Sequence, residues 1–485
     1  MGAPLALLLC AIGIAGLFYF DQNRTIRTSY ALWLVVFWLW IIGSRPVSAW
    51  IGSSSGAEST LSDTLEGSPT DAAIFAVLLG LGIIVLIKRW SKTKSYLSAI
   101  APILIYFSYC LISVSWSPIH GPAFKRWIKA IGDLVMVLII ATDAHPITAL
   151  RRVFSRVGFI LLPLSPVLIR YTVLGRGFDP DGNPENIGVT TNKNDLGLLV
   201  FVVALGALWN VRSLIIHKDE PNRNRRLLAQ VTLLVFGLVL LEEAHSATSI
   251  ACFILGSVLL LVTGSKAIRL RPQRVHVLFA LIVILGGGAF LFGGTGDVAE
   301  AFGRSSTLSG RLAIWHASIA AAGNPIIGTG FESFWNVNVG KVASQLRYYW
   351  HINNLVSAHN GYIEVYLDLG WIGVSLIVFI LVFGYRSASN AFYRNPETGA
   401  LFLAYVATST IYSITEAGFR MLKLSWFFLL MAAVCSSGVN LGLFSERRVV
   451  AKIGSGRSSR KLKFAANGVG WAARAKKGPA PRTQA

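Results

Sequence analysis

The sequence predicts an all-α protein, a polytopic bundle of about 12–13 transmembrane helices, each spanning about 20 residues. The 485-residue chain is 54% hydrophobic and only 14% charged, whereas a soluble domain carries about 25% charged residues. Apolar runs of about 17 residues or more recur along the whole length, each long enough to cross a bilayer. Lys and Arg concentrate in every second connection between these runs, which is the charge pattern of a multi-pass membrane protein.

The apolar runs place the helices in order along the chain. The first run, 4–20, has no basic segment ahead of it, so we expect a retained helix rather than a cleaved signal peptide. Each later run lies between polar or Gly-rich connections that end a membrane helix. The later helices are expected at 30–43, 71–87, 97–114, 127–142, 155–170, 195–211, 227–242, 249–263, 276–293, 362–383, 399–415 and 425–442.

The distribution of charge predicts the orientation of the bundle. The net charge is +21, and most basic residues fall on one side of the predicted membrane, which the positive-inside rule makes cytoplasmic. We expect residues 1–444 to form one membrane-embedded catalytic domain, with a large periplasmic loop at about 294–361. Residues 445–485 form a basic tail for which we expect disorder on the cytoplasmic side. A DNA-binding tail is the rival reading, but proximity to anionic lipid explains the charge without nucleic acid.

The four cysteines fall inside predicted helices, and none lies in the large loop, where a disulfide could form. There is no CxxC pair and no thiol spacing typical of a metal site. We therefore expect small apolar packing residues at Cys10, Cys110, Cys252 and Cys435.

The large loop and its neighbours carry basic residues on the side that should be poor in them. Snorkelling at the interface explains part of this set. Several of the basic residues, however, lie beside Gly-rich or Asn-rich turns near helix ends, where arginine forks and helix N-termini suit a phosphate-bearing ligand. These candidates are Arg126 with Lys129, Arg176, Lys193 and Arg311.

His359 lies where the large loop returns to the membrane, next to Asn360, and Ser357 or Asn360 is a plausible helix cap. A neutral imidazole can accept a proton from a hydroxyl, although a loop histidine is more often a solvated side chain. His316, on an amphipathic segment, and His351, in an aromatic run, are weaker candidates.

Three further signals favour structural readings. Asp179–Asp181 resembles the metal-binding DxD of sugar transferases but is equally a turn, so no metal is expected. Gly328–Ser333 lacks the third glycine of a dinucleotide loop and follows no strand, so no nucleotide cofactor is expected. Glu242, Glu243 and Glu416 lie near outer helix ends, where pairing with an arginine is more common than cation binding.

Three segments together resemble the O-antigen ligase and polymerase family of bacterial inner-membrane proteins: TLSGRLAIW, NPIIGTGFESFW and AHNGYIEVYLDLGWIG, all of which begin within the polar stretch Ser305–Gly370. Gly188–Gly197 and Ser115–Lys129 resemble the exopolysaccharide-polymerisation branch. The resemblance covers about Ser115 to Gly384 and leaves out the tail.

The resemblance implies a metal-independent, multi-pass glycosyltransferase of the inner membrane with its active site facing the periplasm. Its donor would be a glycan on undecaprenyl pyrophosphate, and a chain-length regulator or another envelope polysaccharide protein could be a partner. Matching motifs imply that Arg311 binds the pyrophosphate and His359 activates the acceptor hydroxyl. The remaining substrate-binding candidates are Arg176, Arg126, Lys193, Asn194 and Asn360.

Three alternatives stay open at this point. An O-antigen ligase would differ only in transferring the glycan to lipid A core. A polysaccharide or lipid transporter would carry ionisable residues at mid-membrane depth. The predicted helix centres are almost free of charged residues, and Asp133 is the main exception. A structural envelope protein would use the aromatic loop as a docking surface.

Overall fold

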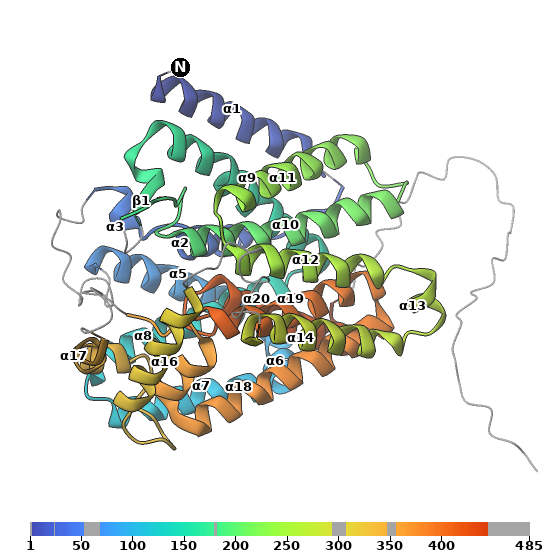
Figure 1. Cartoon of the computed structure of the whole chain (residues 1–485). Coiled ribbons are helices and arrows are strands. Elements are labelled where there is room, and N and C mark those ends of the chain that lie inside the picture. Colours follow the sequence, from blue (N-terminus) through green and yellow to red (C-terminus); the bar gives the residue numbers. More distant parts are fainter. Residues whose placement is uncertain are drawn as a thin grey trace, which may run out of the picture. The chain divides into compact units, whose positions relative to one another are not determined.

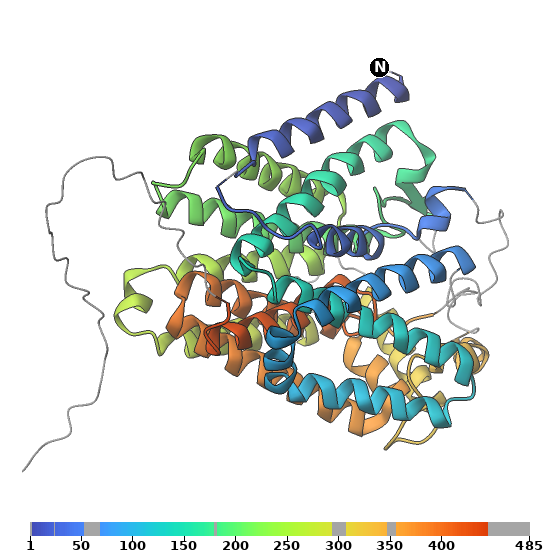
Figure 2. The ribbon, with the colours of Figure 1, turned by 180° about the vertical axis from the view of Figure 1, so that it is seen from behind.

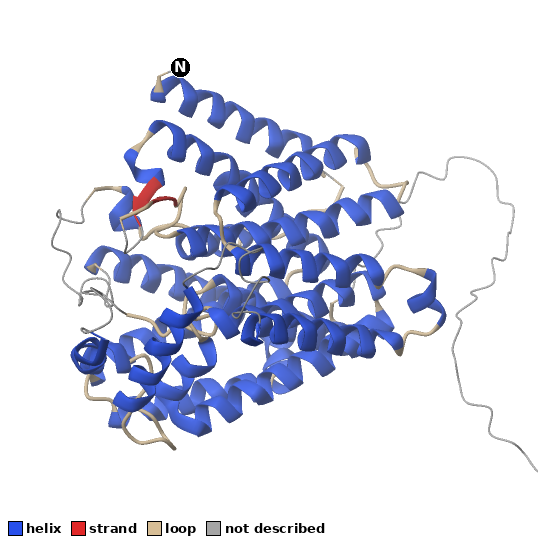
Figure 3. Ribbon diagram, viewed as in Figure 1, coloured by secondary structure: helices blue, strands red, loops and turns tan. Residues whose placement is uncertain are grey.

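The computed structural model describes residues 2–23, 25–52, 68–178, 182–292, 307–346 and 356–444, and these residues are almost entirely helical (Figure 3). The first half contains α1 (Ala3–Phe20), α2 (Leu32–Ile42), α3 (Val47–Trp50), α5 (Pro69–Lys88), α6 (Trp90–Ala99), α7 (Ala101–Ser113), η1 (Val114–Trp116), α8 (His120–Ala141), α9 (Pro146–Tyr171), η2 (Val173–Gly175) and α10 (Lys193–Ile216). The second half contains α11 (Arg223–Glu243), α12 (Ala247–Val262), α13 (Lys266–Leu270), α14 (Arg274–Phe292), α16 (Thr307–Ala321), α17 (Phe334–Leu346), α18 (Gly361–Arg394), α19 (Pro396–Thr415) and α20 (Leu424–Asn440). The strands β1 (Arg176–Phe178) and β2 (Pro184–Asn186) pair as one antiparallel hairpin.

The helices confirm the predicted polytopic bundle. Within the described residues, six helices are long and apolar enough to span a membrane, or seven if α6 and α7, which meet at 84°, form one broken span. Each range predicted from an apolar run overlaps a helix of the structure. The four cysteines are free and lie inside α1, α7, α12 and α20, as predicted.

The centre of the bundle is built by the last helices of the chain. In the 18-residue apolar stretch of α19, 89% of the residues are buried inside the protein, whereas in that of α1 only 11% are buried. Figures 1 and 2 accordingly show α1 at the edge of the bundle, whereas α19 and α20 pass through its middle. The large rings Tyr405, Phe402 and Phe427 are completely or almost completely buried there.

The bundle has two chemically different ends. We call one the loop end; it comprises the connections 172–192 and 416–423 together with α16 and α17. The other is the basic end, with the connections 142–145, 217–222 and 263–273. In Figure 1, α16, α17 and β1 lie at the left, and α13 lies at the right. At the loop end, the buried Arg45 guanidinium donates to the carbonyls of Gly188 and Thr190 and so holds the segment just before α10.

Several charged segments that were expected in connections are helical instead. α8 begins at His120, so Arg126 lies within it, and α9 already contains Arg151 and Arg152. Hydropathy marks only the apolar part of a helix, whereas Arg and Lys are good helix formers that extend it. Their long side chains reach nearby backbone, as when Arg152 Nη2 donates to the carbonyl of Ile26.

The loop end is joined to α18 through a break in that helix. Gly370 has φ +63°, and a Cβ there would lie 2.2 Å from the Ile326 carbonyl oxygen. At this break, the N–H groups of Trp371 and Ile372 donate to the carbonyls of Pro325 and Ile326. The segment after α16 is therefore attached to α18 by backbone hydrogen bonds. The 445–485 tail lies outside the described residues.

Candidate functional site

The carboxylate of Glu416 gathers three side chains at the loop end. Glu416 follows directly after α19, and its side chain is 9% exposed. Its Oε1 accepts from Arg311 Nη2 at 2.9 Å and from Asn194 Nδ2 at 3.0 Å. Its Oε2 lies 3.4 Å from His359 Nδ1. Three residues predicted from the sequence, separated by up to 165 positions, thus converge on one carboxylate, which we call the Glu416 cluster.

Arg311 is held at two points. Besides Glu416, its guanidinium donates through Nη1 to the carbonyl of Thr415 at 2.6 Å. Thr415 is the last residue of α19, and carbonyls at the end of a helix lack an intrahelical partner. A cation is favoured there because the end of the helix carries partial negative charge. The pairing of Glu416 with an arginine, predicted from the sequence, is confirmed.

Asn194 and its neighbour Asp195 enter from the first turn of α10. Asn192 caps this helix, because its Oδ1 accepts the N–H of Asp195 at 2.8 Å. Asp195 in turn binds Lys423 Nζ at 2.7 Å. The cap determines where α10 begins. Because Asn194 lies in the first turn of α10, this also positions its amide beside Glu416.

His359 occupies a backbone conformation that few residues other than glycine adopt. Its φ is +50°, and its N–H donates to Ser357 Oγ at 3.0 Å. Left-handed conformations in non-glycine residues cost energy and cluster at functional sites. The next residue, Asn360, caps α18 by accepting from the N–H groups of Tyr362 and Ile363. Of the two caps predicted from the sequence, Ser357 and Asn360, the structure shows Asn360 as the cap, and its side-chain oxygen sets where α18 begins and so positions His359. Its predicted contact with substrate stays a prediction.

The geometry assigns the tautomer of His359. An ionised carboxylate only accepts hydrogen bonds, so the nitrogen that faces Glu416 carries the proton. The other nitrogen, Nε2, is then the acceptor. The His359 side chain is 40% exposed, whereas Arg311 is 19% exposed, so the imidazole is the more accessible member of the cluster.

Charge keeps Glu416 ionised despite its burial. Burial raises the pKa of this carboxyl, but Arg311, His359 and Lys423 lower it, and the net pKa lies below the usual value for glutamate. Opposite charges nearby stabilise the ionised form. The carboxylate is therefore present at neutral pH, where it orients both Arg311 and His359.

A second ionic group anchors the loop segment to the bundle. Arg420 donates to Glu332 Oε2 through Nε and Nη2, at 3.1 and 2.9 Å, and to the carbonyl of Val356. Burial lowers the pKa of Arg420, but Glu332 and other carboxylates raise it above its usual value overall. Arg126, expected to contact substrate, donates instead to the Glu332 carbonyl and to Asn336 Oδ1. Both arginines thus hold the segment that carries α17.

Arg176 and Lys193 are not brought to the Glu416 cluster by any contact among the described residues. Arg176 is exposed on β1 and donates through Nε to the carbonyl of Ile169 at 2.7 Å. Lys193 Nζ pairs with Glu185 of β2 at 2.5 Å. Both side chains shape the 172–192 connection. Sequence proximity to Asn194 could not distinguish this role from substrate contact.

Other candidates from the sequence fall outside the site. His316 is exposed on α16, and His351 and Asp179–Asp181 lie outside the described residues. Within the residues that the structure describes, no group of three or more His, Cys, Asp or Glu side chains could hold a metal ion.

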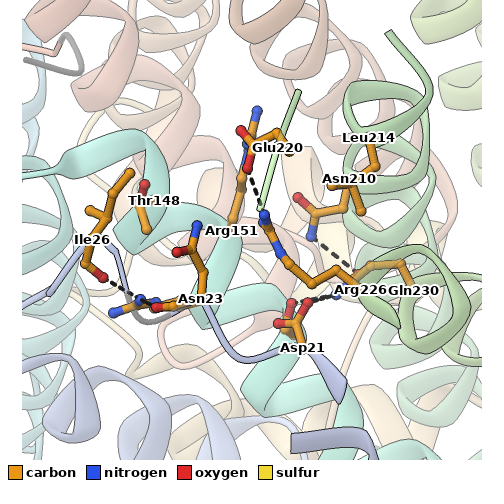
Figure 4. A pocket seen from close by; sticks show the side chains of 12 residues that line it. Asp21, Asn23, Ile26, Thr148, Arg151, Asn210, Leu214, Glu220, Arg226 and Gln230 are labelled. Carbon is orange, nitrogen blue, oxygen red and sulfur yellow. Dashed lines mark hydrogen bonds and ion pairs between the residues drawn. The ribbon is translucent and has the colours of Figure 1, made fainter. Parts of the chain in front are cut away.

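A different charged group lies at the basic end, between α9, α10 and α11 (Figure 4). Arg226 pairs with Glu220 at 2.6 Å, and Arg151 lies 3.7 Å from Glu220 and 3.1 Å from Glu397. The hollow among these residues is about 20 Å³, which is room for about one water molecule. This group is better suited to linking the ends of neighbouring helices by ion pairs than to binding a substrate.

Comparison with known proteins agrees with the motifs. Residues 231–378 match the family described as O-antigen ligase. The chain is also 26% identical over 342 residues to the exopolysaccharide production protein ExoQ of Rhizobium meliloti (strain 1021), covering 67% of this chain and 74% of that protein. The resemblance predicted from the sequence is thereby confirmed. Arg311 and His359 lie within the family match, whereas Asn194 and Glu416 lie outside it.

Proposed function

We propose that this chain, a multi-pass membrane protein of the O-antigen ligase and polymerase type, is a glycan polymerase. It would join oligosaccharide repeats carried on undecaprenyl pyrophosphate, at the periplasmic face of the bacterial inner membrane. The observation that carries the proposal is the convergence of Arg311, His359 and Asn194 on the buried carboxylate of Glu416. The family match supports the same class of chemistry.

The proposed reaction uses His359 as the general base. An acceptor hydroxyl loses its proton to Nε2 of His359 as its oxygen attacks the anomeric carbon of the donor. The bond from that carbon to the phosphate oxygen breaks, and the lipid pyrophosphate leaves with the electron pair. Glu416 stabilises the imidazolium that forms, because its carboxylate faces Nδ1.

Arg311 is the proposed partner of the leaving pyrophosphate. A guanidinium offers five N–H donors, and the hydrogen bonds in the described structure engage it through Nη1 with Thr415 and through Nη2 with Glu416. Further donors remain for phosphate oxygens. Since the carboxylates of Glu416 and Asp195 balance Arg311 and Lys423, the cluster has little excess charge. Arg311 would therefore act through directed hydrogen bonds on charge that develops during bond breaking.

The transporter alternative has less support from the bundle. Asp133 is completely buried, but its two oxygens accept from Trp38 Nε1 at 2.8 Å and from the N–H of Leu422 at 3.1 Å. The carboxylate therefore fixes the 416–423 connection beside the Glu416 cluster. A residue engaged in this way serves the architecture of the site rather than an ion pathway.

The acceptor decides between polymerase and ligase. The relative is named for exopolysaccharide production, which favours a polymerase. A chain-length regulator or other envelope polysaccharide proteins are the partners that we propose for it. Mass analysis of the carrier lipid and surface glycans in a deletion strain tests this. Unpolymerised single repeats are expected, whereas full-length polymer left on the carrier lipid would indicate a ligase. Normal surface glycan would overturn both.

A further inference from the structure

We propose that the groove between η1, the end of α16 and α17 binds the sugar chain of the glycan at a distance from the reacting bond. This inference rests on the proposed function and adds a binding site to it. The hollow measures about 690 Å³, within the range of about 300–1,000 Å³ typical of ligand pockets. Its lining includes Trp116, Thr329, Asn338, Lys341, Ser344 and Gln345.

The groove is connected to the Glu416 cluster by a single helix. α16 carries Arg311 near its first turn and reaches the groove at Ala320 and Ala321. Nine residues separate Arg311 from Ala320, which corresponds to about 13 Å along the helix axis. A ligand that reacts near Arg311 must therefore extend over several residues of its own to reach the groove. An oligosaccharide meets this requirement, whereas a single sugar does not.

The lining has the chemistry of a carbohydrate site. Trp116 offers an aromatic surface, and its indole N–H is buried without a hydrogen-bond partner among the described residues. Buried donors are nearly always satisfied, so an acceptor from a ligand is expected there. The amides of Asn338 and Gln345 and the hydroxyls of Thr329 and Ser344 can both donate and accept, as hydroxyl-rich sugars require.

The charge of the lining and the size of its side chains limit the class of ligand that fits the groove. Lys341 is the one charged side chain among the described residues of the lining. A neutral or acidic glycan fits this balance better than a basic peptide. The residues from Ala320 to Gly323 have small side chains and form a shallow side of the groove. The groove is therefore open enough for a sugar chain to lie across it.

The wall that Gly328 and Thr329 form is held to α18 by backbone hydrogen bonds. Gly328 has φ +69°, and a Cβ there would lie 2.4 Å from backbone atoms of Asp368. The neighbouring N–H groups of Thr329 and Gly330 donate to the carbonyls of Leu367 and Asp368 at 3.1 and 2.7 Å. A preformed wall loses little entropy on binding, which suits a site that must hold a weakly interacting sugar chain.

The test measures binding of free glycan to the full-length protein in lipid nanodiscs. The probe is a set of oligosaccharides released from the host strain's surface glycan, with no lipid attached, titrated by calorimetry. Wild type and His359→Gln should bind equally. Lys341→Ala combined with Gln345→Ala should weaken binding by about tenfold, because two hydrogen bonds are lost. Ala320→Trp, at an exposed position, should block the groove, whereas Lys218→Ala at the basic end should have no effect.

Turnover separates this inference from the proposed reaction. The groove variants should raise the acceptor KM and shorten the product while leaving kcat nearly unchanged, because they remove uniform binding. Absence of glycan binding to wild type, or equal binding to wild type and both groove variants, would overturn the groove assignment. Glycan binding without any turnover of the lipid-linked donor would leave the groove in place and overturn the polymerase.

Discussion

The guanidinium of Arg311 lies 2.9 Å from the carboxylate of Glu416, although 105 residues separate the two along the chain. The same carboxylate faces His359. One buried glutamate therefore orients both Arg311, which we propose binds the leaving pyrophosphate, and His359, the proposed base. The cluster can be tested one member at a time.

Glu416→Gln should lower turnover by about 10²-fold, the size of effect typical for losing a preorganised electrostatic group. The amide keeps the shape and one acceptor oxygen but cannot fix the His359 tautomer by charge. Turnover of lipid-linked repeats by purified protein is the measurement. Glu242→Gln, at an exposed position near the outer end of α11, is the matched control. Equal activity in the two variants would remove Glu416 from the mechanism.

Glu416 should also make stability depend on pH. Its pKa is lowered in the folded state, so its contribution is fully present above the unfolded value of about 4.3. The contribution is lost as the pH falls through the lower folded value. The Tm difference between wild type and Glu416→Gln should therefore be constant near neutrality and shrink below about pH 4.3. A difference that grows on acidification would contradict the assigned charge state.

His359→Ala should reduce turnover by about 10²–10⁴-fold, the usual cost of losing a general base, with donor binding much less affected. His359→Gln should not restore the rate, since an amide does not accept the proton. If the glutamine variant works normally, the residue serves only to hold the loop through its unusual backbone conformation.

Arg311→Ala should cost about 10²–10³-fold in rate, the effect expected for one lost donor to developing charge. Arg311→Lys should recover only part of the activity, because an ammonium group cannot reproduce a bidentate fork. Measurement of membrane abundance by immunoblot controls for folding, since Arg311 also binds the end of α19. A correctly inserted alanine variant with near-normal turnover would rule out the pyrophosphate role.

The orientation of the bundle can be tested by cysteine labelling. The native cysteines lie inside helices, so a membrane-impermeant thiol reagent should react mainly with introduced sites. Lys341→Cys at the loop end should be labelled from the periplasm, and Lys218→Cys at the basic end only after permeabilisation. Both positions are exposed. Labelling of both under the same condition would contradict the periplasmic active site.

Composition and charge pattern were sufficient to predict the bundle. A bilayer accepts only segments whose backbone is internally hydrogen-bonded and whose surface is apolar, so each apolar run had to be a helix. Local patterns also narrowed the cap of α18 to Ser357 or Asn360, and together with the family resemblance they selected Arg311 and His359 as candidates. Helix boundaries were less accurate, as at Arg126, because hydropathy does not report how far a charged segment continues a helix.

Which polar residues meet was decided only by the tertiary structure. Arg311, Asn194 and His359 are brought to Glu416 by the packing of α10, α16 and α19, and no local pattern encodes that packing. Arg126 and Arg176 carry the same kind of charge beside similar turns, yet they bind backbone carbonyls of Glu332 and Ile169. The sequence determined a membrane bundle with charged residues near its loops. Some of these residues join the proposed site and others support the loop segments. This division depends on contacts between segments far apart in the chain, where burial and pairing decide the energy.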